Sequence, residues 1–127
     1  MTLAIMQLRL LTLDKMLHKK RCRLSEMQQE KDAMSLTYTN ASRLYKQIYL
    51  QLNGVSGTVS EEMRQSLTNQ LGDLEPVLQM MNEKENEIDL EIQKTNSEIA
   101  SYSEEMKNVK QWINSNVKKE TAHYSSS

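Results

Sequence analysis

The amino-acid sequence predicts an all-α fold, an antiparallel two-helix coiled-coil hairpin with a short third helix near the turn. The main evidence is a heptad repeat of apolar residues, spaced alternately three and four apart, which occurs once in each half of the chain. A 3.5-residue repeat sustained over many turns keeps one narrow stripe of side chains facing a partner helix, as a coiled coil requires. Only three Gly and one Pro occur among 127 residues, so we expect a few long elements.

The first helix is expected over about residues 2–52. Its heptad positions hold 13 apolar residues out of 15, namely Leu3, Met6, Leu10, Leu13, Leu17, Lys20, Leu24, Met27, Lys31, Met34, Tyr38, Ala41, Tyr45, Ile48 and Leu52. Gly54 can adopt the left-handed conformation that closes a helix, so residues 53–57 are expected to form a loop.

A short helix is expected over 58–71, because Thr58 and Glu61 have the spacing of a capping box and Gly72 can end it. The second long helix is expected over about 74–119, with Pro76 tolerated in its first turn. Its heptad positions hold 11 apolar residues out of 14, namely Leu71, Leu74, Leu78, Met81, Glu85, Ile88, Ile92, Thr95, Ile99, Tyr102, Met106, Val109, Ile113 and Asn116. The alternative is one helix that continues through Gly72 with a kink at Pro76. We expect a single domain over 1–120 and a disordered tail over 121–127.

The two stripes predict a register as well as a fold. If Leu52 faces Leu74 across the short connection, the numbers of facing residues sum to roughly 126. This register brings Lys20 close to Glu104 and Glu105, and it brings Lys31 close to Thr95. Polar residues at heptad positions reject wrong pairings at some cost in stability. We therefore interpret these lysines as structural rather than catalytic.

Charge is distributed unevenly along the sequence. Residues 1–52 carry nine Lys and Arg against four Asp and Glu, and residues 58–127 carry seven against thirteen, giving +5 and −6. A basic and an acidic helix attract each other across the positions that flank the stripe. The alternative is that part of the surplus serves a separate charged partner.

The first turns carry apolar residues in excess of what the stripe needs, and exposed apolar patches usually mark contact surfaces. The only Trp is expected to lie at the same end, where it could instead cover these residues within the monomer. The densest basic cluster follows at residues 18–23. The candidate partner-binding residues are therefore Leu3, Ile5, Leu8, Leu11, Trp112, Lys19, Arg21 and Arg23.

Catalytic, cofactor-binding and metal-binding residues are not expected. His18, Cys22 and Glu26 share a helix face, but nothing in the sequence places a second pair of ligands opposite them. No stretch approaches the roughly 20 apolar residues that span a bilayer, and the single cysteine suits a reducing compartment, so we expect a cytoplasmic location. Without aromatic residues among the basic ones, nucleic acid is not favoured as a partner.

The plan of a basic first helix, a short Gly/Ser hinge and an acidic second helix resembles the rod-shaped stalk proteins of bacterial type III export systems, including the flagellar one. The likeness covers roughly residues 3–119. The segments Gln7–Leu13 and Glu83–Asp89 are also similar to small uncharacterised helical proteins of gut bacteria. Neither resemblance implies an activity.

These features together predict a non-enzymatic coiled-coil binding or structural protein that presents a rigid helical rod to a protein partner or to a second copy. One alternative is a subunit or chaperone of a bacterial secretion or export assembly. Another is a peripheral protein whose residues 1–23 lie on an anionic membrane surface, a partner that is possible but not favoured.

Overall fold

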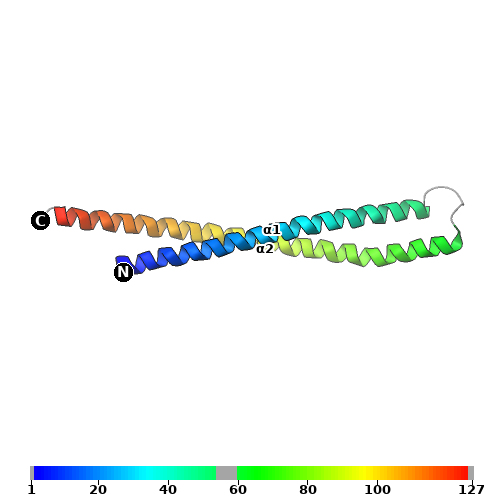
Figure 1. Ribbon diagram of the computed structural model, residues 1–127, viewed down its shortest axis with the longest axis horizontal. Coiled ribbons are helices and arrows are strands. Elements are labelled where there is room, and N and C mark those ends of the chain that lie inside the picture. Colours follow the sequence, from blue (N-terminus) through cyan, green and yellow to red (C-terminus); the bar gives the residue numbers. More distant parts are fainter. Residues whose placement is uncertain (1, 54–59, 126–127) are drawn as a thin grey trace. The chain divides into compact units, whose positions relative to one another are not determined.

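The computed structural model describes residues 2–53 and 60–125, and within these ranges it contains two long α-helices and no strand (Figure 1). Helix α1 spans Leu3–Asn53 and helix α2 spans Glu61–Ser125. The two helices pack against each other, which confirms the all-helical hairpin. Asn53, the first residue of the predicted loop, ends α1, and residues 54–57 of that loop lie outside the described residues.

A hydroxyl side chain caps the start of each helix. The backbone amide of Ile5 donates a hydrogen bond to Thr2 Oγ1 at 3.3 Å, and the amide of Met63 donates to Ser60 Oγ at 3.2 Å. Such caps satisfy amides that have no partner within the helix. Thr58, the predicted cap, lies outside the described residues, and Ser60 has this role in α2.

The chain divides into two compact units. We call residues 1–26 and 92–127 the terminal unit, and residues 27–91 the hairpin unit. Each unit pairs a segment of α1 with a segment of α2, and the boundary between the units falls inside both helices. The contacts within each unit show that the paired segments are antiparallel, because increasing numbers on α1 meet decreasing numbers on α2.

The predicted heptad positions form the buried seam between the helices. Each of them is buried or half-buried, whereas most other residues of both helices are exposed. The least exposed seam residues are Leu13 (0%), Met27 (1%), Leu17 (3%), Ile48 (5%), Val109 (5%) and Thr95 (7%). The apolar burial that holds each unit together therefore lies along the stripe that the heptad repeat predicts.

The predicted register is wrong by about one heptad. Lys20 pairs with Glu98 rather than with Glu104 or Glu105, and Lys31 pairs with Asp89, so the numbers of the paired residues sum to 118 and 120 instead of 126. A register shifted by seven residues, with a sum of 119, again places seam positions opposite each other within each unit. A heptad repeat satisfies both registers equally, and the polar contacts distinguish them.

Polar contacts between the helices fix this register in both units. In the terminal unit, Arg9 Nε donates to Glu105 Oε1 at 2.9 Å, and the second contact is the ion pair of Lys20 with Glu98. The contacts of the hairpin unit are the ion pair Lys31–Asp89, the hydrogen bond from Ser35 to Glu85 at 2.8 Å, and the hydrogen bond from Tyr45 to Glu75 at 2.9 Å. In each of these ion pairs the base lies on α1 and the acid on α2. This supports the interpretation that the basic and acidic helices pair with each other.

The separate short helix predicted at 58–71 is also wrong, because residues 61–71 are the first turns of α2, which continues through Gly72 and Pro76. Leu67 is only 7% exposed and extends the seam with the same spacing. Burying a leucine contributes about 1.5–3 kcal/mol, which exceeds the cost of about 1 kcal/mol for an exposed helical glycine. An unbroken helix is therefore favoured over a break at Gly72.

Helix α2 also extends to Ser125, beyond the predicted end near residue 119. Residues 117–122 include Lys, Glu and Ala, which have high helix propensity and extend the helix past the last heptad position. Residues 126–127 of the predicted tail lie outside the described residues.

Candidate interaction surface

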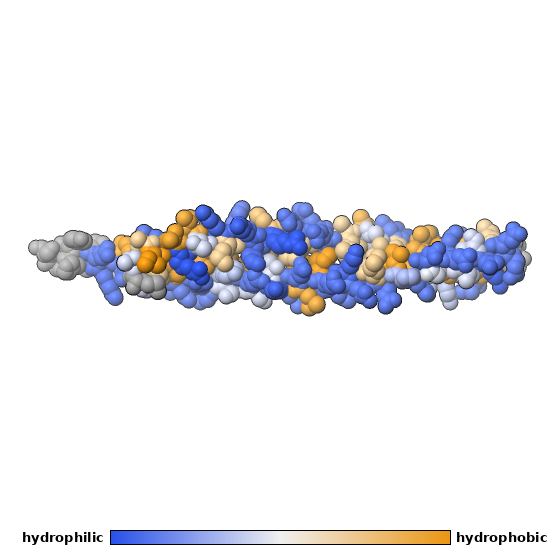
Figure 2. Space-filling view, turned by 90° about the horizontal axis from the view of Figure 1, so that it is seen from below, coloured by the Kyte–Doolittle hydropathy of each residue, from blue (hydrophilic) through white to orange (hydrophobic). Residues whose placement is uncertain are grey.

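The terminal unit exposes apolar side chains on the side of α1 that faces away from the seam. Ile5 is 53% exposed, Leu8 is 62% exposed and Leu11 is 52% exposed. Figure 2 shows apolar surface beside the grey residues at this end of the terminal unit. Trp112 is half-buried on α2 and leaves these three side chains exposed, so it does not cover them as the monomer alternative required.

Helical geometry places these residues on one continuous face, which we call the outward face of α1. Its members lie at the three heptad positions farthest from the seam, and all are exposed. They are Ala4, Ile5, Leu8, Leu11, Thr12, Lys15, His18, Lys19, Cys22, Ser25 and Glu26. The face begins apolar and becomes basic, and its one acidic residue is Glu26 at its end, which pairs with Arg23. Leu3, predicted both as a heptad position and as a contact residue, lies in the seam and is half-buried.

The structure disperses the basic cluster around the helix. Lys19 lies on the outward face, whereas Lys20 turns into the seam towards Glu98. Arg23 forms an ion pair with Glu26 at 3.5 Å along α1. The predicted residues Lys19, Arg21 and Arg23 therefore do not form one patch, and Lys19 is the one that lies beside the apolar turns.

The ion pair of Lys20 with Glu98 joins α1 to α2, and the pKa of each side chain shifts in the direction that favours its charged form. The hydrogen bond from Lys20 to Glu98 raises the pKa of the Lys20 ammonium above its ordinary 10.5, and it lowers the pKa of the Glu98 carboxyl below its ordinary 4.5. A hydrogen bond with Asp89 likewise raises the pKa of Lys31. Both lysines stay charged at neutral pH, which suits ion pairing and does not suit general-base catalysis.

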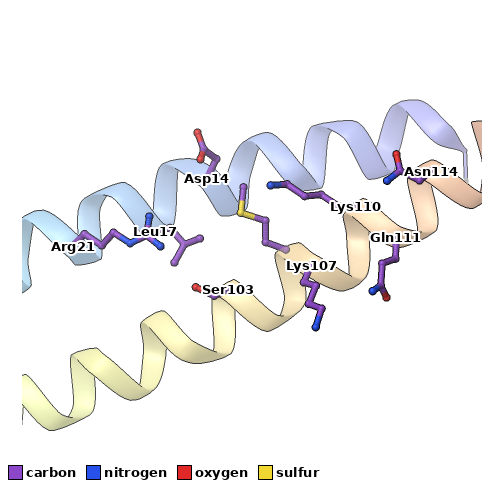
Figure 3. A pocket seen from close by; sticks show the side chains of 9 residues that line it. Asp14, Leu17, Arg21, Ser103, Lys107, Lys110, Gln111 and Asn114 are labelled. Atoms are coloured by element: carbon purple, nitrogen blue, oxygen red, sulfur yellow. The ribbon is translucent and has the colours of Figure 1, made fainter.

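Arg21 lies in a groove on another side of the terminal unit, with a volume of about 490 Å³. Figure 3 shows Leu17 between the two helices, with Lys107 and Gln111 on the α2 side. The groove is open to solvent, and its charged lining consists of Arg21, Lys107, Lys110 and Asp14. Such a surface can contact an acidic side chain of a partner, but it lacks the enclosed, water-excluding shape of a catalytic cleft.

His18 and Cys22 approach each other on α1, with Cys22 Sγ 3.7 Å from His18 Nε2. Glu26, the third residue of that face, contacts Arg23 instead. Among the described residues, no group of three or more His, Cys, Asp or Glu side chains is placed to hold a metal ion. In the same part of the chain, no helix is long and apolar enough to cross a membrane.

The hairpin unit carries a second exposed apolar surface that the sequence reasoning did not identify. On α2, Val77 is 36% exposed, Met80 is 49% exposed and Leu90 is 65% exposed, and the exposed Glu83 and Glu87 lie between Met80 and Leu90. The side chain of Met80 also lines an open groove of about 430 Å³ together with seam residues of both helices. The sequence could have predicted this surface, because Val77, Met80 and Leu90 are apolar and lie outside the heptad positions that form the seam.

The two units carry opposite net charge. The terminal unit has 11 Lys and Arg against 6 Asp and Glu, and the hairpin unit has 5 against 11, giving +5 and −6. The two units therefore differ in net charge, as the first and second halves of the sequence do. A difference of this size sets the electrostatic preference of each unit for its partners.

Comparison of the chain with models of protein families, with curated proteins and with solved structures found no match. The resemblance to export-system stalk proteins therefore stays a prediction.

Proposed function

We propose that the protein is a non-enzymatic coiled-coil binding protein, and that the outward face of α1 in its terminal unit contacts a protein partner. The observation that carries this proposal is the exposure of Ile5, Leu8 and Leu11, each more than half exposed, on a unit whose seam is already filled. Exposed apolar residues that do not serve the monomer's own packing are typical of contact surfaces.

The charges next to this apolar patch support a selective contact. Lys15 and Lys19 follow it on the same face, and neither takes part in the ion pairs that join α1 to α2 in the described residues. Apolar burial would contribute most of the affinity, and the lysines would increase the association rate and reject basic partners.

Site-specific photocrosslinking tests this function. A benzophenone-bearing phenylalanine replaces Leu8 in one variant and Asn69 in a control, in cells that normally make the protein. Asn69 is exposed on α2 of the hairpin unit and is not a member of the outward face. We expect a protein adduct, identified by mass spectrometry, from position 8 and not from position 69. The absence of an adduct at position 8, or equal adducts at both positions, would contradict the proposal.

A further inference from the structure

We infer that the partner is a second copy of this chain, with the outward face of α1 in one terminal unit docked on the exposed face of α2 around residues 77–90 in the hairpin unit of another copy. This inference rests on the proposed function, because it names the partner of the same surface. The first argument is net charge. A unit of charge +5 repels another of its kind and attracts a unit of charge −6.

The second argument is the pattern of exposed side chains on the two faces. Along α1, the two exposed leucines Leu8 and Leu11 precede two exposed lysines. Along α2, the exposed Val77 and Met80 precede two exposed glutamates. With the two helices parallel, the pattern matches Leu8 to Val77, Leu11 to Met80, Lys15 to Glu83 and Lys19 to Glu87.

The third argument is that these four charged residues are available for such a contact. Lys15, Lys19, Glu83 and Glu87 are exposed and lie outside the seam, and none of them belongs to an interhelical ion pair within either unit of the described chain. The leucines of α1 and the apolar residues of α2 would lose their contact with water in the complex. Apolar burial of this kind supplies affinity, while complementary charges fix the register of the contact.

A reciprocal charge reversal tests the inference with the full chain in sedimentation equilibrium. The unmodified chain is expected to self-associate at about 25 mM salt and to shift towards monomer at about 500 mM, because salt screens exposed charges. The variant K15E/K19E places acid against acid, and the variant E83K/E87K places base against base. Each variant alone is expected to associate at least about tenfold more weakly than the unmodified chain.

Mixing the two variants is the decisive measurement. The acidic α1 of K15E/K19E then meets the basic α2 of E83K/E87K, and the unmodified faces of the two variants also match, so the mixture is expected to recover the association. The control K107E/K110E makes the same change in net charge on the groove side of the terminal unit. It lowers the general attraction between the units but leaves the matched face intact, so it is expected to weaken association clearly less than K15E/K19E does. Circular dichroism of each variant checks that the helices remain folded.

A chain that stays monomeric at low salt, a mixture that does not recover association, or a control that weakens association as strongly as K15E/K19E would overturn the inference. A monomer that floats with vesicles of anionic phospholipid would overturn it in favour of a membrane surface. If position 8 crosslinks to a different protein while the chain is monomeric, the inference fails and the proposed function stands. If position 8 gives no adduct, the proposed function itself fails.

Discussion

Replacement of a leucine by alanine should have very different effects on the two sides of α1. Leu13 is 0% exposed in the seam, and Leu36 is 64% exposed on the same helix. The change removes three carbon atoms in both cases, so any difference reports the environment of the side chain. Leu36 lies outside the proposed docking face, so its exposure does not depend on self-association.

The structure sets the expected magnitudes. At about 0.8 kcal/mol per buried methylene, L13A loses roughly 2.4 kcal/mol of transfer free energy, and the cavity it leaves raises the cost to about 2.5–4 kcal/mol. Because Leu36 buries only about a third of its surface, L36A should cost less than about 1 kcal/mol. With an unfolding entropy of roughly 2.1 cal/mol/K per residue, L13A should lower Tm by about 9–15 °C and L36A by less than about 4 °C.

Thermal unfolding followed by circular dichroism at low protein concentration, with urea unfolding as a second probe, measures both values. Equal shifts for the two variants, or a fall of less than about 3 °C for L13A, would refute the assignment of Leu13 to a buried seam. A large effect of L36A would mean that the side of α1 facing away from the seam is covered in solution.

Two further predictions concern the helices and their ion pairs. Glu98 has a lowered pKa in the folded state, so its stabilising pair with Lys20 is fully present above the ordinary pKa of 4.5 and is lost as pH falls through the folded value. The Tm of the unmodified chain should therefore exceed that of E98Q at pH 7, and the difference should shrink as the pH falls below 4.5; a difference that does not shrink under acid conditions would contradict this assignment. G72A should raise the free energy of unfolding by about 1 kcal/mol, because a Cβ at Gly72 would meet no heavy atom within 4 Å and Ala has the higher helix propensity; a loss of stability in urea unfolding would mean that α2 is not a regular helix there.

The heptad repeat predicted correctly that the chain forms long paired helices and which of their residues are buried. A side chain at each heptad position returns to the same side of the helix, so the period alone separates the seam from the solvent-facing positions. Leu13 and Val109 could be assigned to the core in this way, and Ile5, Leu8 and Leu11 could be recognised as surplus. The same local pattern could not decide whether Gly72 breaks α2. The low helix propensity of Gly72 favours a break, whereas the burial of Leu67 in the seam favours a continuous helix.

The tertiary structure alone decided the register and the arrangement of charge. Sliding one helix by seven residues keeps apolar residues opposite apolar residues, so hydrophobic burial hardly distinguishes the two registers, whereas pairs such as Lys20 with Glu98 form in only one of them. The division of both helices into two units, with boundaries inside α1 and α2, makes one unit basic and the other acidic. A net charge depends on which residues lie together in space, and a one-dimensional repeat does not specify that.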